Sequence, residues 1–242
     1  MKGTLVLSQE SYIEKVLKSF GMEDSKPITT PLAPQFKLKS LTKAEPLEQA
    51  VRMEEIPYAS VVGSLMYAMV VSRFMSKPGM DHWKAVKWIL KYLRGESKTS
   101  LTFVKSSVCS IKGFSDSDYS ADLDRRRSVT GYVFKVWGNT VSWISNLQSV
   151  VALLTIEAEY MAFSTATKEA VWLKAICEEL GLQTGSVKMH FDSQSALDLA
   201  KNRVFQERTK HVANKYHFIR DIVAHDDIIL HKITQERIEL TS

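Results

Sequence analysis

The chain has 242 residues, of which 45% are hydrophobic and 24% are charged. These values are ordinary for a globular protein of one or two domains, and they exclude a disordered chain, a collagen and a coiled-coil rod. No stretch reaches the ~18–20 uninterrupted apolar residues of a membrane span, and two cysteines cannot make a disulfide framework. We therefore expect an intracellular, reduced protein, cytoplasmic or nuclear, that does not enter a membrane.

The charge is uneven along the chain, whose formal net charge is +5. Residues 1–105 carry 16 Lys and Arg against 10 Asp and Glu, and residues 106–242 carry 16 against 17. A basic front part beside a nearly neutral back part suits a polyanion-binding module joined to one that keeps its carboxylates for another purpose. A solvated surface with chance asymmetry explains the charges equally well.

The front part of the chain is predicted to be mainly helical. Residues 4–8 predict a strand, and residues 9–20 predict an amphipathic helix that ends at Gly21. Residues 26–56 begin with several prolines and predict a linker. Helical patterns return at residues 58–74 and 82–93.

The back part mixes strand and helix patterns. The predicted strands are residues 110–117, 131–137, 140–144, 187–192 and 228–233. The predicted helices are residues 155–180, 193–201 and 209–224. Three strands in series, followed by interleaved helices and strands, imply a mixed sheet covered by helices and therefore an α/β fold.

Two acids stand out because each lies where a predicted strand ends. Asp116 ends the first strand of the sheet, although acids are poor strand formers. Asp192 ends a later strand, and sites in open α/β sheets lie at the carboxyl ends of strands. Other interpretations stay open, because a strand-end turn explains Asp116 and a helix N-cap explains Asp192.

A third acid, Glu159, lies near the start of the helix predicted over residues 155–180. At about 100° per residue, Glu159 falls within the apolar stripe that faces the sheet, whereas Glu157 falls on the opposite side, toward water. A lone carboxylate on a buried face is costly unless it is paired or binds a metal. The alternative is a helix that starts later and leaves Glu159 in solvated backbone.

These three acids predict a metal centre if the fold brings them together. Clustered carboxylates repel one another unless hard divalent cations neutralise them, and oxygen-rich sites suit Mg²⁺. Two Mg²⁺ ions about 4 Å apart would activate a water and stabilise the leaving oxygen of a phosphodiester. We therefore expect Asp116, Glu159 and Asp192 to be both metal-binding and catalytic.

Two basic segments are candidates for nucleic-acid contact. They are Arg125, Arg126 and Arg127, in a turn after the first strand of the sheet, and Lys84, Lys87 and Lys91, at helical spacing. The turn would contact phosphates beside Asp116 without reading sequence, and the helix face would follow a nucleic-acid backbone. A solvated loop and a solvated helix face explain these residues equally well.

Several longer motifs occur in order along the chain. They are Gly-Phe-Ser-Asp-Ser-Asp-Tyr at 113–119, Asp-Leu-Asp-Arg-Arg-Arg-Ser-Val-Thr-Gly-Tyr at 122–132, Thr-Ile-Glu-Ala-Glu-Tyr at 155–160, Phe-Asp-Ser-Gln-Ser-Ala at 191–196 and Arg-Thr-Lys-His-Val at 208–212. Together they resemble the ribonuclease H domain of copia-type LTR-retrotransposon Pol polyproteins. The front half resembles the end of the same family's reverse transcriptase, through Leu-Val-Leu-Ser-Gln at 5–9, Tyr-Ala-Ser-Val-Val-Gly at 58–63 and Trp-Ile-Leu-Lys-Tyr-Leu-Arg-Gly at 88–95.

The resemblance implies a ribonuclease H-like domain over residues 106–242, with a mixed five-stranded sheet and flanking helices. It implies a smaller, mostly helical, thumb-like remnant of the reverse transcriptase over residues 1–105, without the polymerase active site. The implied activity is Mg²⁺-dependent cleavage of the RNA strand of RNA–DNA hybrids. Asp116, Glu159 and Asp192 match three of the family's four metal-binding acids.

The chain also departs from the family. The family's fourth acid lies in an Ala-Asp-x-x-Thr-Lys run after the last strand, which this chain lacks, and Glu236 and Glu239 are the candidates to replace it. Residues 69–74 look like a fusion across a gap in the thumb-like region. Loss of one ligand would weaken one metal site and lower the rate. The alternative function is therefore a non-catalytic nucleic-acid-binding relic or a fragment co-opted by a host.

Overall fold

The computed structural model describes residues 3–33, 35–40, 53–65, 69–106, 110–182, 185–194, 219, 221–223, 225 and 227–233. The chain divides into two compact units. We call Val6–Thr102 the helical unit, and Met1–Leu5 with Phe103–Ser242 the sheet unit. The identification of these units with a reverse transcriptase remnant and a ribonuclease H-like domain remains a prediction.

The helical unit packs short amphipathic helices around one apolar core. The helices are α1 (Glu10–Ser19), α3 (Tyr58–Ser64), α4 (Met69–Ser72) and α5 (Met80–Gly95). Val16 and Leu17 of α1 lie in the same buried cluster as Val86 and Leu90 of α5. The smaller, mostly helical region expected before the sheet is therefore present.

Where one continuous helix was predicted over residues 58–74, the structure has two, α3 and α4. The hydroxyl of Tyr58 in α3 donates a buried hydrogen bond of 2.7 Å to the carbonyl oxygen of Val71 in α4. This bond requires α4 to fold back toward the start of α3, and a single straight helix could not make it. The predicted helix over residues 58–74 was wrong in this respect.

Strand β1 (Thr4–Ser8) was predicted, but its partner β2 (Ser100–Val104) was not. The two strands form a two-stranded sheet. The side chains of β2 alternate between exposed and half-buried, so the strand lacks the buried face that makes a period-2 pattern visible.

The sheet unit contains a mixed five-stranded sheet with the order β5-β4-β3-β6-β7. Its strands are β3 (Ile111–Asp118), β4 (Val129–Val136), β5 (Asn139–Leu147), β6 (Val187–Phe191) and β7 (Ile228–Lys232). β3, β4 and β5 form an antiparallel meander, whereas β6 runs parallel to β3, and β7 parallel to β6. The predicted α/β class, with a mixed five-stranded sheet, is confirmed.

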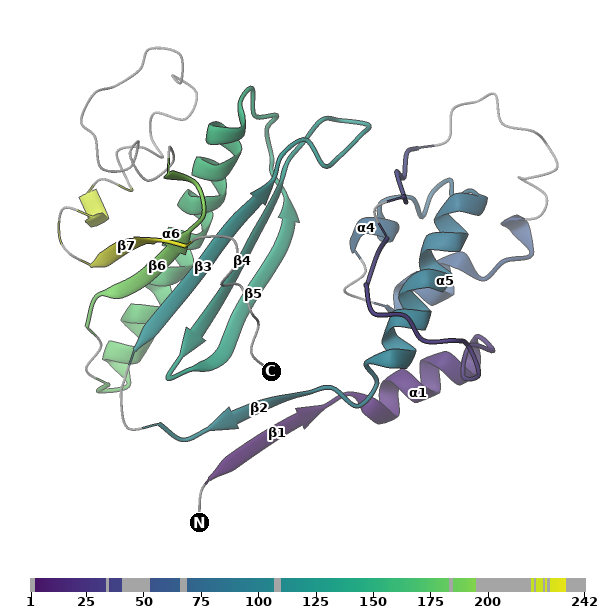
Figure 1. The fold of residues 1–242 in the computed structure, drawn as a ribbon, viewed down its shortest axis with the longest axis horizontal. Helices are drawn as coiled ribbons and strands as arrows, with labels where there is room; N and C mark the ends of the chain where they lie inside the picture. Colours follow the sequence, from purple (N-terminus) through teal and green to yellow (C-terminus); the bar gives the residue numbers. More distant parts are fainter. Residues whose placement is uncertain are drawn as a thin grey trace. The chain divides into compact units, whose positions relative to one another are not determined.

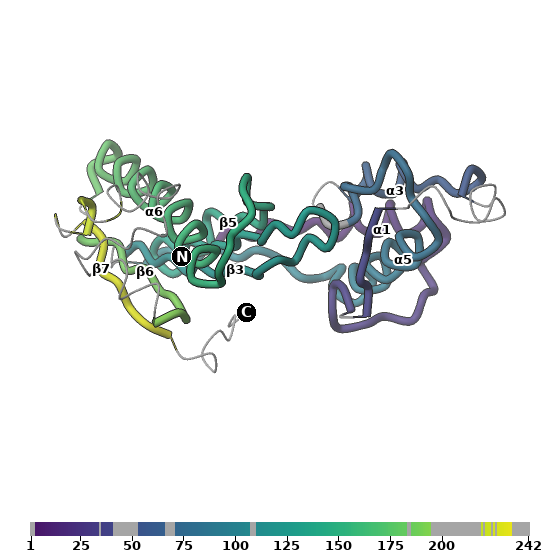
Figure 2. Tube along the Cα trace, turned by 90° about the horizontal axis from the view of Figure 1, so that it is seen from above, coloured from purple at the N-terminus to yellow at the C-terminus, as the bar shows by residue number. Residues whose placement is uncertain are grey.

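One face of this sheet is covered by the long helix α6 (Thr155–Glu179), which lies behind the strands in Figure 1 and to one side of them in Figure 2. Its buried alanines, among them Ala158, Ala166 and Ala170, pack in one cluster with Phe134 and Met189 of the sheet. Small side chains on the contact face let the helix lie close to the strands. The start of α6 is thereby fixed beside the end of β3.

The helices predicted over residues 193–201 and 209–224 lie almost wholly outside the described residues. Within them, residues 221–223 are helical. Ile219 is fully buried and belongs to the same core cluster as α6 and the sheet.

Candidate metal centre

Three carboxylates meet at one edge of the five-stranded sheet. Asp116 lies near the end of β3, Asp192 directly follows β6, and Glu159 lies in the second turn of α6. β3 and β6 are parallel neighbours, so their carboxyl ends point to the same edge. One oxygen of each carboxylate lies within 4.8 Å of an oxygen of the other two. The structure thus brings together the three acids selected from the sequence.

Ser117, which was not selected from the sequence, links two of these acids. Its hydroxyl donates a hydrogen bond of 2.8 Å to Oε1 of Glu159. Its backbone N–H donates one of 2.8 Å to Oδ1 of Asp116. The sequence could have predicted that Ser117 faces α6, because side chains alternate between the two faces along β3.

The cluster changes how readily its members ionise. Burial raises the pKa of Glu159 to about 7, and the charges of Asp192 and Asp116 raise it too, while the hydrogen bond from Ser117 lowers it. Partial burial also raises the pKa of Asp116, with Asp192 as the next cause. Three like charges on partly desolvated carboxylates are therefore unfavourable without a counter-charge.

The donor set fits a hard divalent cation. All three side chains offer carboxylate oxygens, which are the ligands that Mg²⁺ prefers. Oδ1 of Asp192 is buried and accepts no hydrogen bond from any residue that the structure describes. Among the described residues, this is the one group of three or more His, Cys, Asp or Glu side chains close enough to share a metal ion. A bound cation would supply both the missing partner and the counter-charge.

The expectation that Glu157 faces water was wrong. Glu157 is 4% exposed, and its Oε2 accepts a hydrogen bond of 2.7 Å from the backbone N–H of Leu153. The carboxylate folds back over the first turn of α6 and binds the chain that enters the helix, an interaction that a helical-wheel projection does not show. Glu159 is half-buried, as expected for a side chain turned toward the sheet.

The three arginines lie in the loop between β3 and β4, at the same end of the sheet as Asp116. The backbone N–H of Arg126 donates to the carbonyl oxygen of Asp122 at 2.7 Å, and the backbone N–H of Asp122 donates to the carbonyl oxygen of Arg127 at 2.9 Å. These bonds close a tight loop, and Arg126 adopts a left-handed φ of 57° within it. The side chains of Arg125 and Arg126 are exposed. Their contact with nucleic acid remains a prediction.

Lys84, Lys87 and Lys91 lie on α5 of the helical unit. Lys84 forms an exposed ion pair of 2.8 Å with Asp81, and the Nζ of Lys87 lies 5.7 Å from the centre of the Trp83 ring. Both lysines therefore already have partners on their own helix. The candidates for a fourth acid, Glu236 and Glu239, lie outside the described residues.

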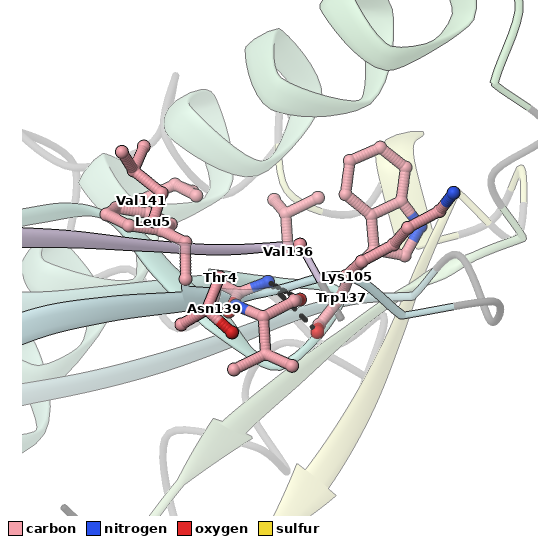
Figure 3. Close-up of a pocket in the computed structure, with 10 residues that line it drawn as sticks. Thr4, Leu5, Lys105, Val136, Trp137, Asn139 and Val141 are labelled. Atoms are coloured by element: carbon pink, nitrogen blue, oxygen red, sulfur yellow. Dashed lines mark hydrogen bonds between the residues drawn. The ribbon is translucent and has the colours of Figure 1, made fainter. Parts of the chain in front are cut away.

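A pocket elsewhere in the sheet unit contains none of the three acids. Residues of β1, β2 and the β4–β5 hairpin line it, among them Leu5, Val136 and Val141 (Figure 3). The side-chain amide of Asn139 binds the backbone of Val104 there: its Oδ1 accepts from the N–H at 2.7 Å, and its Nδ2 donates to the carbonyl at 3.0 Å. This pocket is mainly apolar and offers no cluster of metal-binding groups.

None of the helices in the described part of the chain has the length and apolar character of a membrane-spanning segment.

Comparison with known proteins gives long matches to Pol polyproteins. The chain is 46% identical to the retrovirus-related Pol polyprotein from transposon TNT 1-94 of Nicotiana tabacum, over 95% of this chain and 18% of that protein. It is 34% identical to the corresponding polyprotein from transposon RE1 of Arabidopsis thaliana, over 90% of this chain and 15% of that protein. The chain is a homologue of the retrovirus-related Pol polyproteins of plant transposons. It spans less than a fifth of their length. No protein-family model matches it.

Among solved structures, the chain is similar to ribonuclease H1 LC11 in complex with an RNA/DNA hybrid. The match has a TM-score of 0.40 and 18% sequence identity, and it covers 52% of this chain and 86% of that one.

Proposed function

We propose that the sheet unit is a ribonuclease H-type nuclease that cleaves the RNA strand of RNA–DNA hybrids with divalent cations, with Mg²⁺ as the natural one. The observation that carries the proposal is the convergence of Asp116, Glu159 and Asp192 within 4.8 Å. The resemblance of the surrounding motifs to the ribonuclease H domain of copia-type Pol polyproteins supports the choice of substrate.

The side chains have distinct tasks in this proposal. Asp116 and Asp192 would hold the cations, and Glu159 would join them once it has lost its proton. Ser117 keeps Glu159 turned toward the other two acids through its 2.8 Å hydrogen bond. Cations bound there would activate a water and stabilise the oxygen that leaves the phosphodiester.

The arginine loop would hold the duplex beside this centre. Arg125 and Arg126 are exposed and lie at the carboxylate end of the sheet, where they would bind phosphates of either strand. The helical unit, with Lys84, Lys87 and Lys91, would be the remnant of the reverse transcriptase and would add further backbone contacts.

A cleavage assay tests the proposal. The substrate is a hybrid with a labelled RNA strand, offered with Mg²⁺ and, in parallel, with EDTA. We expect Mg²⁺-dependent cleavage that falls by at least about 100-fold in D116N and D192N, because each removes a charged ligand. The control is E179Q, which neutralises an exposed acid near the end of α6, away from the cluster. Absence of cleavage at high concentrations of folded protein would overturn the proposal and leave binding without turnover.

A further inference from the structure

Three lysines lie side by side on the face of the sheet opposite α6. Lys112 of β3 is the register partner of Lys135 on β4 and of Lys188 on β6. Register partners point to the same face of a sheet. The neighbours of Lys112 in sequence, Ile111 and Gly113, are buried on the α6 side, so the lysines lie on the other side. We call Lys112, Lys135 and Lys188 the lysine row.

The lysine row is unfavourable without an anion. Like charges directly opposite one another on neighbouring strands destabilise a sheet. Within the described part of the chain, none of the three lysines forms an ion pair with an acid. Lys112 and Lys188 are exposed, and Lys135 is half-buried. The row therefore offers three adjacent ammonium groups to a ligand with several negative charges.

The lysine row and the metal centre share the same strands. Lys112 and Asp116 lie four residues apart on β3, and Lys188 and Asp192 lie four residues apart at β6. Within β3 the even spacing keeps Lys112 and Asp116 on one face, about 13 Å apart at the usual rise per residue of a strand, and Asp192 directly follows the neighbouring strand β6. That distance corresponds to about four nucleotide steps along a duplex axis.

Stacked rings occupy the space between the lysines and the acids. Phe114 and His190 stack with ring centres 5.0 Å apart, and His190 and His231 with centres 5.2 Å apart. Val133 on β4 is the register partner of Phe114, and Trp143 on β5 is the register partner of Val133. Trp143, which is 57% exposed, therefore continues the line of rings onto β5. A flat, partly apolar strip between a basic row and a carboxylate site suits the sugars and backbone of a nucleic-acid strand.

We propose that the lysine row binds backbone phosphates of the nucleic acid whose scissile phosphate lies at the carboxylates. The row holds the strand about four nucleotides from the cleavage point, through charge and without reading sequence. This inference rests on the proposed nuclease function for its substrate. The other occupant that would neutralise three lysines is an acidic helix of a protein partner, and binding measurements with both kinds of ligand separate the two.

Binding is measured by fluorescence anisotropy with a labelled RNA–DNA hybrid in EDTA, so that cleavage plays no part. The test variant is K112Q/K135Q/K188Q. The matched control is K18Q/K98Q/K168Q, which removes the same charge from three exposed lysines elsewhere. For each phosphate that the protein no longer binds, the slope of log K against log salt becomes shallower by about 0.9. We expect this slope to become shallower by about 2 to 3 in the test variant and by less than 1 in the control.

Thermal unfolding gives a second measurement on the same proteins. Because the test variant removes like-charge repulsion, we expect its melting temperature to equal or exceed that of the natural sequence. If the triple variant does not fold, K112Q alone removes the central lysine and is expected to reduce the slope by about one.

The outcomes separate this inference from the proposed function. Equal salt slopes in test and control variants overturn the lysine row, whether or not the protein cleaves hybrids. A reduced slope in the test variant without any cleavage by the natural sequence supports the row and overturns the nuclease. If the test variant still binds the hybrid but no longer binds a labelled poly-glutamate peptide, the row is assigned to an acidic protein partner and the proposal is overturned.

Discussion

The Ser117 hydroxyl lies 2.8 Å from Oε1 of Glu159 and donates a hydrogen bond to it across the gap between β3 and α6. The same residue binds Asp116 through its backbone N–H. Ser117 therefore favours the charged forms of two acids whose burial and mutual repulsion favour the neutral forms. Ser117 thereby lowers the pH at which the cluster would be ready to bind a cation.

Ser117→Ala is expected to raise the pKa of Glu159 above about 7, because the hydrogen bond that lowers it is removed. The rising limb of the pH profile of Mg²⁺-dependent cleavage should move up by about 0.5–1 pH unit. The matched control is Ser142→Ala, which removes a 2.6 Å hydrogen bond between a serine of β5 and Glu169, away from the cluster. An equal displacement in both variants would contradict the role given to Ser117.

Glu159→Gln is expected to stabilise the cation-free protein at pH 8. The pKa of Glu159 is higher in the folded chain, about 7, than its ordinary value of 4.5. The folded state therefore binds more protons between these two values, and the free energy of unfolding falls as the pH rises through this window. Glutamine has no such loss, so the variant should gain about 1 kcal/mol, a figure discounted for partial exposure of the side chain.

Urea denaturation in EDTA at pH 8 and pH 4.5 measures this difference. The gain should be present at pH 8 and nearly absent at pH 4.5, because the loss of stability accumulates only as the pH rises from about 4.5 to about 7. Glu179→Gln, at an exposed position near the end of α6, serves as the control. A variant that is less stable than the natural sequence at pH 8 would show that Glu159 has a counter-charge already.

Glu157 and Glu159 are two residues apart, but their substitutions should have opposite effects. Glu157→Ala removes the 2.7 Å hydrogen bond to the N–H of Leu153 and should cost about 1–2 kcal/mol of stability. Cleavage by the folded fraction should stay within a few-fold of normal. Denaturation curves and activity measured on one preparation check both points, and a large loss of activity without a loss of stability would place Glu157 in the site.

Gly113 is required by the close approach of neighbouring side chains. A Cβ added there would lie 2.3 Å from Sδ of Met189 and 2.4 Å from Cε1 of Phe134, so the core would have to shift. Gly113→Ala should therefore destabilise the sheet unit by about 1–3 kcal/mol. Gly185→Ala is the control, since a Cβ there meets nothing within 4 Å. Equal melting temperatures for the two variants would contradict the packing described.

Much of the fold and most of the site followed from local patterns. The strands that end near Asp116 and Asp192 have clear alternation, and the apolar stripe of α6 was long enough to point Glu159 toward the sheet. Strand order and parallel pairing then bring these ends together. The resemblance to a known family pointed to the same three acids.

What escaped prediction depends on contacts that the periodicity of a single helix or strand does not reveal. The burial of Glu157 comes from a hydrogen bond to the turn before its helix, which an ideal helical wheel omits. The break between α3 and α4 accompanies a tertiary bond from Tyr58 to Val71. The lysine row becomes visible only when the registers of three strands are known.

Joint binding of a divalent cation by Asp116, Glu159 and Asp192 underlies the proposed chemistry, and calorimetric titration of the chain with Mg²⁺ at pH 7 is its sharpest test. We predict binding with release of protons, because Glu159 is partly protonated at this pH. We also predict an affinity lower by about tenfold or more in D116N, E159Q and D192N, since each removes a charged ligand, and an unchanged affinity in E179Q, which neutralises an exposed acid near the other end of α6. Equal Mg²⁺ affinity in all four variants, or no binding by the natural sequence, would show that these acids do not form a cation site.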